Sequence, residues 1–368
     1  MTPKLRFSEF KGEWKRFLLK DIVEIKAGGD LPPFWSKEKN DEFKFPIFSN
    51  SLENYGLYGY SKLPKITAKE SVTVTGRGSV GIPVFRKGAY TPIVRLLTLI
   101  PKNSYVTDCK FLELAIQSIH IFIESTGVPQ LTSPQIGAYR IVLTEYKEQQ
   151  KIASLFCAVE QKINLLTKKK EALETYKKGL MQKIFSQELR FKREDGTDYP
   201  EWEVTYLGEL CSITTGKLDA NAQVEDGRYL FFTCAKEVFR IDEYAFEGAS
   251  LLISGNGANV GYIHNYEGRF NAYQRTYVLQ NIGVNRHYLQ YYLEQNLQRR
   301  IHREKKDGNT PYIVMSTLSM MKIALPSEIE ANKIARAMMT IDESLKQLTK
   351  KLNSTIEQKK GLLQQMFV

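Results

Sequence analysis

The chain has 368 residues, of which 42% are hydrophobic and 25% are charged, and its 52 Lys and Arg against 41 Asp and Glu give a formal net charge of +11. This composition is that of a globular protein and excludes a disordered chain, and the length indicates two or three domains at roughly 100 to 200 residues each. No apolar run approaches the ~20 residues that span a bilayer, and the first residues lack the apolar core of a signal peptide, so we expect a soluble cytoplasmic protein.

A first globule is predicted over residues 1–144. Its β-rich runs, such as SVTVT (71–75) and IVRLLTLI (93–100), are punctuated by Gly, Pro and Asn, which is typical of strands joined by turns. An apolar run at 111–123 favours a short helix. We therefore expect a twisted, mostly antiparallel sheet with a few helices.

A long helix is predicted over residues 145–185. Ile152, Val159, Leu166, Leu173 and Leu180 recur every seven residues, which keeps the apolar stripe on one narrow face. Such a stripe favours a long helical partner in a coiled coil. The alternative is that the helix packs its stripe on its own globule.

A second globule is predicted over residues 186–326. It has the β-rich runs YLFFT (229–233), SLLIS (250–254) and TYVLQ (276–280), and a helical run at 287–306. The same mixture of short strands and helices is expected as in the first globule.

A second long helix is predicted over residues 327–368, and it duplicates the first. Shifted by 182 residues, LTKKKEALETYKKGLMQKIF (166–185) matches LTKKLNSTIEQKKGLLQQMF (348–367) at 10 of 20 positions. Outside the helices, SVTVTGRGSVG (71–81) is echoed by SLLISGNGANVG (250–261). The second apolar seam runs through Ile334, Ile341, Leu348 and Leu362, and the two seams are interrupted by Lys170, Lys177, Thr355 and Lys359.

These elements predict an α+β fold with an internal pseudo-two-fold repeat, because self-similarity at a fixed shift indicates one duplicated unit. Two similar globules are joined by two long helices, and each helix finds its partner most simply in the other copy. We expect the helices to form an antiparallel coiled coil.

The sequence gives no positive evidence of catalysis. Gly76-Arg-Gly78-Ser-Val-Gly81 has the spacing of a dinucleotide loop, but Pro83 follows where a helix would have to begin, so a tight turn between strands is favoured. Leu31-Pro32-Pro33-Phe34 resembles an amino-methyltransferase signature, but Leu31 cannot accept a hydrogen bond from a flipped base. The four Cys and four His are dispersed, which predicts reduced structural thiols and no metal site.

The globules do offer Arg, Lys, Asn, Gln and aromatic side chains on glycine-punctuated stretches, and such side chains contact bases and phosphates. Two of these stretches, STGVPQLTSPQ (125–135) and DGNTPYI (307–313), occupy matching places in the two globules and imply one task performed twice. The predicted DNA-binding residues are Lys37, Lys39, Asn50, Tyr55, Tyr58, Arg77, Ser79, Gln130, Thr132, Gln135, Asn256, Asn259, Tyr273, Gln274, Arg275, Arg299, Arg300, Arg303, Asn309, Thr310 and Tyr312.

The net charge is unevenly distributed. It is +7 for residues 1–144, +4 for 145–185, −2 for 186–326 and +2 for 327–368. The second globule would therefore have to bind DNA through a local patch. The basic residues predicted to form that patch are Arg286, Arg299, Arg300, Arg303, Lys305 and Lys306.

The doubled layout resembles the specificity subunit of type I restriction-modification systems. The resemblance is carried by the helix ends KKGLMQKIF and KKGLLQQMF, the turns TGRGSVG and SGNGANVG, and the loops STGVPQLT and DGNTPYIV. It implies a non-catalytic DNA-recognition subunit of a type I restriction endonuclease and adenine methyltransferase complex. Two target recognition domains would each read one half of a bipartite site, while the coiled coil fixes the spacer and docks the modification subunits.

The resemblance also implies the partners and cofactors of the chain. The partners would be double-stranded DNA, probably two modification (methyltransferase) subunits, and restriction/translocase subunits, with no membrane. This chain would hold no cofactor, because S-adenosylmethionine would bind the modification subunits, and ATP and Mg the restriction subunit. Two other functions stay open: a coiled-coil scaffold that binds only proteins, and a self-contained DNA-modifying enzyme with an unrecognised site.

Overall fold

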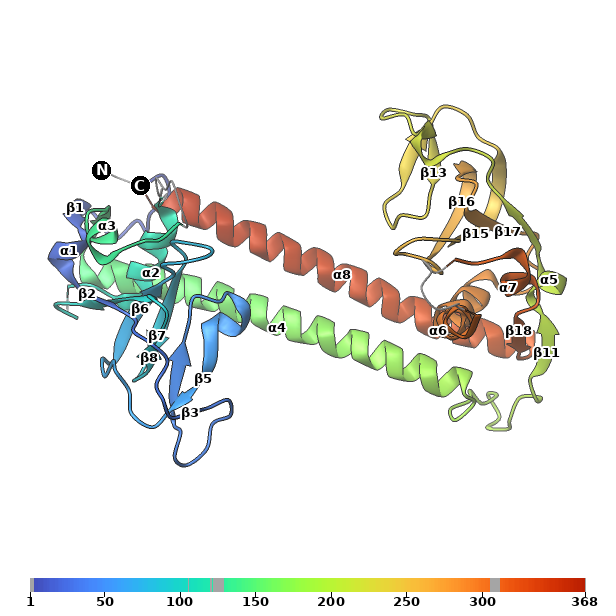
Figure 1. The fold of residues 1–368 in the computed structure, drawn as a ribbon. Coiled ribbons are helices and arrows are strands. Elements are labelled where there is room, and N and C mark those ends of the chain that lie inside the picture. The colour runs from blue at the N-terminus through green and yellow to red at the C-terminus, as the bar shows by residue number, and fades with distance from the viewer. Residues whose placement is uncertain (1–2, 105, 120, 122–128, 305–311, 368) are drawn as a thin grey trace. The chain divides into compact units, whose positions relative to one another are not determined.

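The computed structural model describes residues 3–104, 106–119, 121, 129–304 and 312–367. The chain forms two compact units, one made of Met1–Thr167 with Lys350–Val368 and the other of Lys168–Thr349 (Figure 1). Each unit contains one globule and a part of both long helices. Within the described ranges, no helix combines the length and the hydropathy needed to cross a membrane.

The first globule is built on a four-stranded antiparallel sheet in the order β2-β9-β6-β7. Val72 and Val74 of β6 are fully buried, and so are Leu97 and Leu99 of the neighbouring strand. Helix α2 packs on this sheet and begins where the Asp108 carboxylate accepts a hydrogen bond from the N–H of the third helical residue, as an N-cap does. The elements are β2 (Val23–Ala27), β6 (Glu70–Val74), β7 (Pro83–Lys87), β9 (Leu97–Pro101) and α2 (Cys109–Ser118).

A second four-stranded sheet, in the order β3-β5-β4-β8, stands beside the first one in the same globule. A two-stranded ladder of β1 and β10 and two short helices, α1 and α3, complete the globule. The elements are β1 (Lys15–Leu18), α1 (Leu19–Ile22), β3 (Trp35–Ser36), β4 (Phe45–Phe48), the 3-10 turn η1 (Glu53–Gly56), β5 (Leu57–Ser61), β8 (Thr91–Pro92), α3 (Ser133–Gly137) and β10 (Arg140–Leu143).

The second globule has one six-stranded sheet, in the order β12-β17-β15-β16-β13-β14. Helix α6 covers the sheet with Leu289, Leu293 and Leu297, which are all fully buried. The elements are β11 (Glu203–Tyr206), α5 (Leu207–Leu210), β12 (Ser212–Thr215), η2 (Ala220–Ala222), β13 (Tyr229–Phe232), β14 (Phe239–Ile241), β15 (Phe246–Ser254), β16 (Ile263–Ala272), β17 (Thr276–Gln280), α6 (Arg286–Glu304), α7 (Met315–Ser319) and β18 (Lys322–Leu325).

The two globules share one topology, which confirms the predicted duplication. The order β2-β9-β6-β7 in the first corresponds to β12-β17-β15-β16 in the second, and the ladder β1-β10 corresponds to β11-β18. The expectation of one sheet per globule is wrong for the first globule. There the strand that corresponds to β16 is broken at Gly88 (φ 82°), which has a left-handed backbone, and its two pieces, β7 and β8, belong to different sheets.

Two elements have other bounds in the structure than those predicted from the sequence. The run IVRLLTLI is a strand only from Leu97 onward, because Leu96 N donates to Ile93 O (3.1 Å) and closes a turn at 93–96. The helix expected at 111–123 is α2, which ends at Ser118. The run TYVLQ is a strand over its whole length, as predicted.

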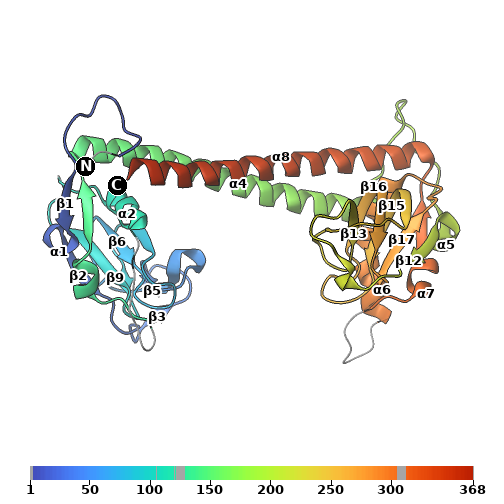
Figure 2. The same cartoon turned by 90° about the horizontal axis from the view of Figure 1, so that it is seen from above.

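The two long helices, α4 (Tyr146–Phe185) and α8 (Glu328–Met366), lie side by side in each unit (Figures 1 and 2). In the first unit Lys359 Nζ donates to Glu160 Oε1 (2.7 Å), and the ring of Phe367 contacts that of Phe156. In the second unit Lys177 Nζ donates to Asp342 Oδ1 (2.6 Å). Residue numbers rise along α4 as they fall along α8, so the helices are antiparallel, as predicted.

The predicted seam residues are buried or half-buried along both helices. Ile152, Ile334 and Leu348 are buried, and the other predicted seam positions are half-buried. Ile152 belongs to the core of the first globule, so the first turns of α4 also pack on their own globule. The supercoiling of a coiled coil stays a prediction.

Candidate nucleic-acid interface

Four backbone segments meet at one edge of the first globule. Gly28 N donates to Leu96 O (2.8 Å), and Leu131 N donates to Gly76 O (2.9 Å). A Cβ on Gly76 would lie 2.6 Å from the carbonyl oxygen of Arg95, so only glycine lets these two turns approach. The side chains that these segments and the neighbouring residue 50 carry are called loop cluster 1: Asn50, Arg77, Ser79, Val94, Arg95 and Gln130.

The side chain of Asn50 ties two turns of loop cluster 1 together. Its Oδ1 accepts a hydrogen bond from Gly76 N (2.8 Å), and its Nδ2 donates to Val94 O (2.5 Å). Both ends of the amide are therefore committed to the backbone. Asn50, predicted from the sequence to contact DNA, holds the neighbouring turns in place.

Arg77 is held by Gln130 across the edge of the globule. Its Nε and Nη2 both donate to Gln130 Oε1, at 3.1 and 2.9 Å, and the two residues form an isolated antiparallel bridge. The Arg77 side chain is exposed, so its other N–H groups can reach an acceptor outside the protein. An arginine held in this way is preorganised to donate two hydrogen bonds to one edge of a base.

The second globule repeats this arrangement of the backbone. Gly255 N donates to Arg275 O (2.8 Å), Ile313 N donates to Gly255 O (2.7 Å), and Asn256 and Tyr312 form the equivalent bridge. A Cβ on Gly255 would lie 2.3 Å from Arg275 O. The corresponding side chains are called loop cluster 2: Asn256, Asn259, Gln274, Arg275 and Tyr312.

Two side chains of loop cluster 2 are bound within the globule. Gln274 Nε2 donates to Asp219 Oδ1 (2.6 Å), and Asn259 Nδ2 donates to Cys234 O (3.2 Å). Tyr312, by contrast, is 56% exposed. The same backbone frame therefore presents different side chains in the two globules.

Left-handed backbone outside glycine is concentrated near loop cluster 1. Asn54 (φ 46°) and Tyr55 (φ 53°) form one such pair, and Val94 (φ 52°) and Arg95 (φ 63°) form another. The conformation is costly for a β-branched residue such as Val94. Strain of this kind is found at functional sites, where the surrounding contacts enforce it.

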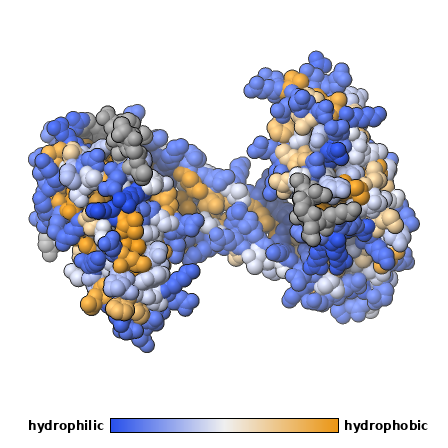
Figure 3. Space-filling view, viewed as in Figure 1, coloured by the Kyte–Doolittle hydropathy of each residue, from blue (hydrophilic) through white to orange (hydrophobic). Residues whose placement is uncertain are grey.

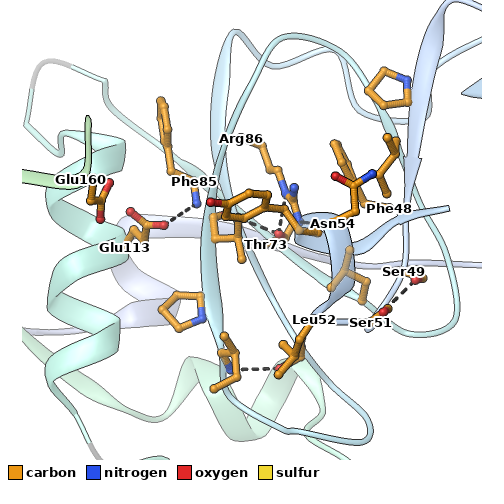
Figure 4. A pocket seen from close by; sticks show the side chains of 18 of the residues that line it. Phe48, Ser49, Ser51, Leu52, Asn54, Thr73, Phe85, Arg86, Glu113 and Glu160 are labelled. Atoms are coloured by element: carbon orange, nitrogen blue, oxygen red, sulfur yellow. Dashed lines mark hydrogen bonds between the residues drawn. The ribbon is translucent and has the colours of Figure 1, made fainter. Parts of the chain in front are cut away.

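A pocket of about 1070 Å³ lies beside loop cluster 1, between the strands and helices α2 and α4 (Figure 4). On its wall, Arg86 is 7% exposed and its guanidinium lies 3.8 Å from the centre of the Phe48 ring. Arg86 Nε donates to Thr73 Oγ1 (2.9 Å) and Nη2 donates to Tyr55 O (2.7 Å). Burial lowers the pKa of Arg86 to about 10, which leaves it charged at neutral pH.

Arg86 fixes the strained turn that presents an aromatic side chain. The guanidinium binds the carbonyl of Tyr55, which lies at the border of the pocket with a side chain that is 75% exposed. A Cβ on Gly56 would lie 2.7 Å from Ser49 O, so the next residue must be glycine. Exposed aromatic rings on a rigid turn are suited to stacking on bases.

The far wall of the pocket carries an ion cluster on α2, α4 and α8. Lys110 Nζ pairs with Glu113 and with Glu160 Oε2 (2.6 Å), and Lys359 Nζ pairs with Glu160 Oε1 (2.7 Å). Burial acts to raise the pKa of Glu160, but the hydrogen bonds from the two lysines outweigh it and the pKa is lowered. Figure 4 also shows the Glu113 carboxylate accepting the backbone N–H of Phe85 (2.9 Å).

The cysteines do not form disulfides, in agreement with the predicted thiols. Burial raises the pKa of Cys109 and of Cys211 to about 12, so both are protonated at neutral pH. In the part of the chain that the structure describes, no group of three or more His, Cys, Asp or Glu side chains is placed to hold a metal ion.

The family model of the type I restriction modification DNA specificity domain matches residues 11–175 and 199–358 of the chain. The chain belongs to this family. Each of the two matched ranges contains one loop cluster and most of one long helix. The duplication seen in the sequence and in the fold is thus a duplication of the specificity domain.

Named relatives of this specificity-domain chain are themselves specificity subunits. It is 40% identical over 141 residues to the EcoDI type I restriction enzyme specificity subunit of Escherichia coli, a match covering 38% of this chain and 31% of that protein. It is 23% identical over 402 residues to the MjaVIII specificity subunit of Methanocaldococcus jannaschii, covering 97% of this chain and 92% of that one. The chain thus matches only about a third of the EcoDI subunit's length.

A solved structure shares the fold of this specificity-domain chain. The crystal structure of the S subunit of a type I restriction-modification system from M. genitalium superposes with a TM-score of 0.72 at 19% identity, covering 100% of this chain and 99% of that chain. At this level of identity, the comparison shows the fold.

Some of the other predicted DNA-binding residues are exposed, and others make contacts within the protein. Lys37, Lys39, Tyr58, Arg299 and Arg303 are exposed. Thr132 and Gln135 are bonded to one another at the start of α3, and Arg300 Nη1 donates to Met320 O (3.1 Å). Tyr273 is half-buried in the turn before β17, and Asn309 and Thr310 lie outside the described residues. Contact with DNA stays a prediction for each of these residues.

Arg95 is the residue of loop cluster 1 that sequence reasoning missed, together with its strained neighbour Val94. The signal was present, because Arg95 precedes LLTLI (96–100) as Arg275, which was predicted, precedes TYVLQ (276–280). Aligning these two runs places the arginines at equivalent positions, 180 residues apart.

Proposed function

We propose that this chain is the DNA sequence-specificity subunit of a type I restriction-modification complex, and that each globule reads one half of a bipartite site. The observation that carries the proposal is that loop clusters 1 and 2 share one backbone frame and differ in side chains. Arg77 in the first corresponds to Asn256 in the second, and Gln130 corresponds to Tyr312. Such a pair of readers suits a target whose halves differ in sequence.

Base reading is assigned to Arg77, which is exposed, and to Asn256, which is half-buried. Arg77, braced by Gln130, suits guanine, whose O6 and N7 accept two hydrogen bonds from arginine. Asn256 suits adenine, whose N6 and N7 match a carboxamide. Tyr55 adds a stacking surface at the side of loop cluster 1.

Catalysis is assigned to partner subunits. In this proposal the modification subunits hold S-adenosylmethionine and methylate a base within the site, usually adenine, and the restriction subunits use ATP and Mg to translocate and cut DNA. This chain binds the DNA and holds it in position for those subunits. Because the chain would bind chromosomal DNA, the cytoplasm stays its predicted location.

The long helices are assigned to spacing and docking. α4 exposes Leu165 (68%) and Tyr176 (59%), and α8 exposes Ile329 (65%) and Ile356 (43%). Figure 3 shows apolar atoms on the surface of the helical part. Exposed apolar side chains on long helices suit the helices of other subunits, for which we propose two modification subunits.

The exposed helix residues would also suit a scaffold that binds only proteins, so the experiment has to separate the two functions. Residues 1–144 are replaced by the corresponding part of another family member, and the methylated sites are sequenced in cells that carry the modification subunits. We expect one half of the bipartite site to change and the other half to stay. The reciprocal exchange of 186–326 should change the other half, whereas an unchanged site in both exchanges contradicts the proposal.

A further inference from the structure

Both globules carry an exposed arginine at one shared position. Arg95 ends the turn before β9, and Arg275 ends the turn before β17. The carbonyl oxygen of each arginine is packed against the first glycine of a Gly-x-Gly turn, Gly76 or Gly255, where a Cβ would lie within 2.6 Å of it. The shared packing fixes the backbone of both arginines against the turn that carries the base readers.

The neighbours of these arginines differ between the globules. Val94 precedes the first arginine and Gln274 the second, and the Gly-x-Gly turns carry Arg77 and Asn256 respectively. Bases differ from one half-site to another, but phosphate groups do not. A side chain common to both clusters is therefore suited to the group that every half-site presents.

The backbone conformation of the two turns also favours a phosphate over a base edge as the ligand of both arginines. Val94 and Arg95 both have left-handed backbone, at φ 52° and 63°, whereas Gln274 and Arg275 do not. The backbone conformation therefore differs between the two arginines. Bidentate base reading requires one fixed geometry, but a phosphate accepts hydrogen bonds from many directions and tolerates this difference.

Both guanidinium groups are available for a ligand. Among the described residues, neither Arg95 nor Arg275 has a carboxylate partner within ion-pair distance. Two arginines of the predicted patch on α6 are engaged instead: Arg286 pairs with Glu267 (3.1 Å) and Arg300 with Glu304 (3.1 Å). In the second globule, whose net charge is negative, Arg275 is thus a cation at the edge that carries loop cluster 2, without a carboxylate partner in the described part of the chain.

We propose that Arg95 and Arg275 are matched phosphate contacts, one for each half-site, that fix the position of the DNA on each globule. The remaining exposed members of the loop clusters then read the bases. The inference rests on the proposed function and deepens it by separating positioning residues from specificity-determining ones.

The test uses the full chain assembled with its modification subunits. Binding is measured by fluorescence anisotropy, on a labelled duplex that carries the methylated site and on a scrambled duplex, at several salt concentrations. The variants are Arg95→Ala and Arg275→Ala, with Arg95→Lys and Arg275→Lys as conservative changes. Arg140→Ala and Arg193→Ala are controls, because these exposed arginines lie outside the loop clusters, and matching melting curves check that every variant is folded.

Each alanine variant should weaken binding to both duplexes by the same factor, about fivefold, and reduce the slope of log K against log salt by about 0.9. The lysine variants should keep the slope, and the controls should bind like the unchanged protein. Arg77→Ala should weaken binding to the specific duplex alone. An unchanged salt slope, or a loss of binding confined to the specific duplex, overturns the inference, whereas failure of the unchanged complex to bind either duplex overturns the proposed function itself.

Discussion

In each unit, an arginine forms an ion pair with a buried glutamate at the start of one long helix. In the first, Arg6 Nε and Nη2 donate to the two carboxylate oxygens of Glu148, both at 2.7 Å. In the second, Arg190 donates in the same way to Glu330, at 3.3 and 2.9 Å. Both glutamate side chains are fully buried, so the duplication has kept an interaction that leaves an uncompensated charge when either partner is lost.

The surroundings of the two ion pairs differ at a matching tryptophan. Trp202 Nε1 donates to Glu330 Oε2 (3.1 Å), whereas the buried Trp14 Nε1 has no hydrogen-bond partner among the described residues. In the first unit Thr144 Oγ1 donates to Glu148 instead. Both units therefore keep the charged pair, while the third member of the network differs between them.

The ion pairs between α4 and α8 follow the same pattern, with a conserved charged pair and a third member that differs. Glu160 is paired with Lys359 in the first unit, and Asp342 with Lys177 in the second, and each pair of positions is related by the 182-residue shift. Of the three lysines that interrupt the predicted apolar seams, Lys177 and Lys359 therefore pair with carboxylates across the helices. The third member is Lys110 in the first unit and the hydroxyl of Tyr291 in the second, both at 2.6 Å.

The largest effect is expected from removing one buried carboxylate charge. Glu148→Gln and Glu330→Gln each leave a half-buried arginine beside a fully buried neutral amide, and each should lower the free energy of unfolding by about 3 kcal/mol. Hydrogen exchange followed by mass spectrometry checks the result. Glu148→Gln should increase exchange in the first unit alone, and Glu330→Gln in the second, so equal loosening of both units would contradict the comparison.

The two tryptophans should differ when each is replaced by phenylalanine. Both changes lose similar packing, but Trp202→Phe also removes a hydrogen bond to a carboxylate, whereas Trp14→Phe removes a buried N–H that no described residue accepts. We expect Trp202→Phe to cost about 1.5 kcal/mol more than Trp14→Phe. Urea unfolding followed by circular dichroism measures the difference, and equal costs would show that the hydrogen bond contributes nothing.

The strained turn of loop cluster 1 should be relieved by asparagine. Asparagine tolerates left-handed backbone, so Val94→Asn should stabilise the first unit by about 1 kcal/mol. Gln274→Asn is the matched control in the second globule, where the backbone is not left-handed, and it should give no gain. A thermal melt checks both variants, and a loss of stability in Val94→Asn would mean that its side chain packs more favourably than the strain costs.

The smallest effect is a pH dependence at the helix seam. The pKa of Glu160 is lowered from its ordinary value of 4.5, so its contribution to stability is present above about pH 4.5 and is lost as the pH falls through the lowered value. Because a third of this side chain is exposed, we expect less than about 1 kcal/mol. Melting curves between pH 3 and 6 should show a shallower decline for Glu160→Gln than for the unchanged chain, and parallel declines would contradict this assignment.

The organisation of the fold could be predicted from local patterns. A seven-residue apolar period is a property of one helix, and it located α4 and α8 and the face that each buries. Strands such as TYVLQ were found because a run of β-prone residues and its flanking turn residues are equally local. The duplication needed only the comparison of the chain with itself.

The candidate site could be predicted only in part, because the role of a polar side chain depends on contacts distant in sequence. Arg77 and Gln130 were both named, but their pairing across 53 residues was not. Asn50 proved to brace two turns, since Gly76 and Val94 come within reach of its amide only in the folded globule.

The sequence by itself determined that this protein is one specificity-domain unit made twice, with paired long helices, because repeats and periods are written in the order of residues. The tertiary structure decided which polar residues are committed to the fold and which stay free. It broke a strand of the first globule at Gly88 and paired Lys177 and Lys359 with carboxylates across the helices. It left the side chains of Arg95 and Arg275 exposed, with no carboxylate partner among the described residues. The physical reason is that a hydrogen bond or ion pair is set by distances in space, which sequence spacing does not contain.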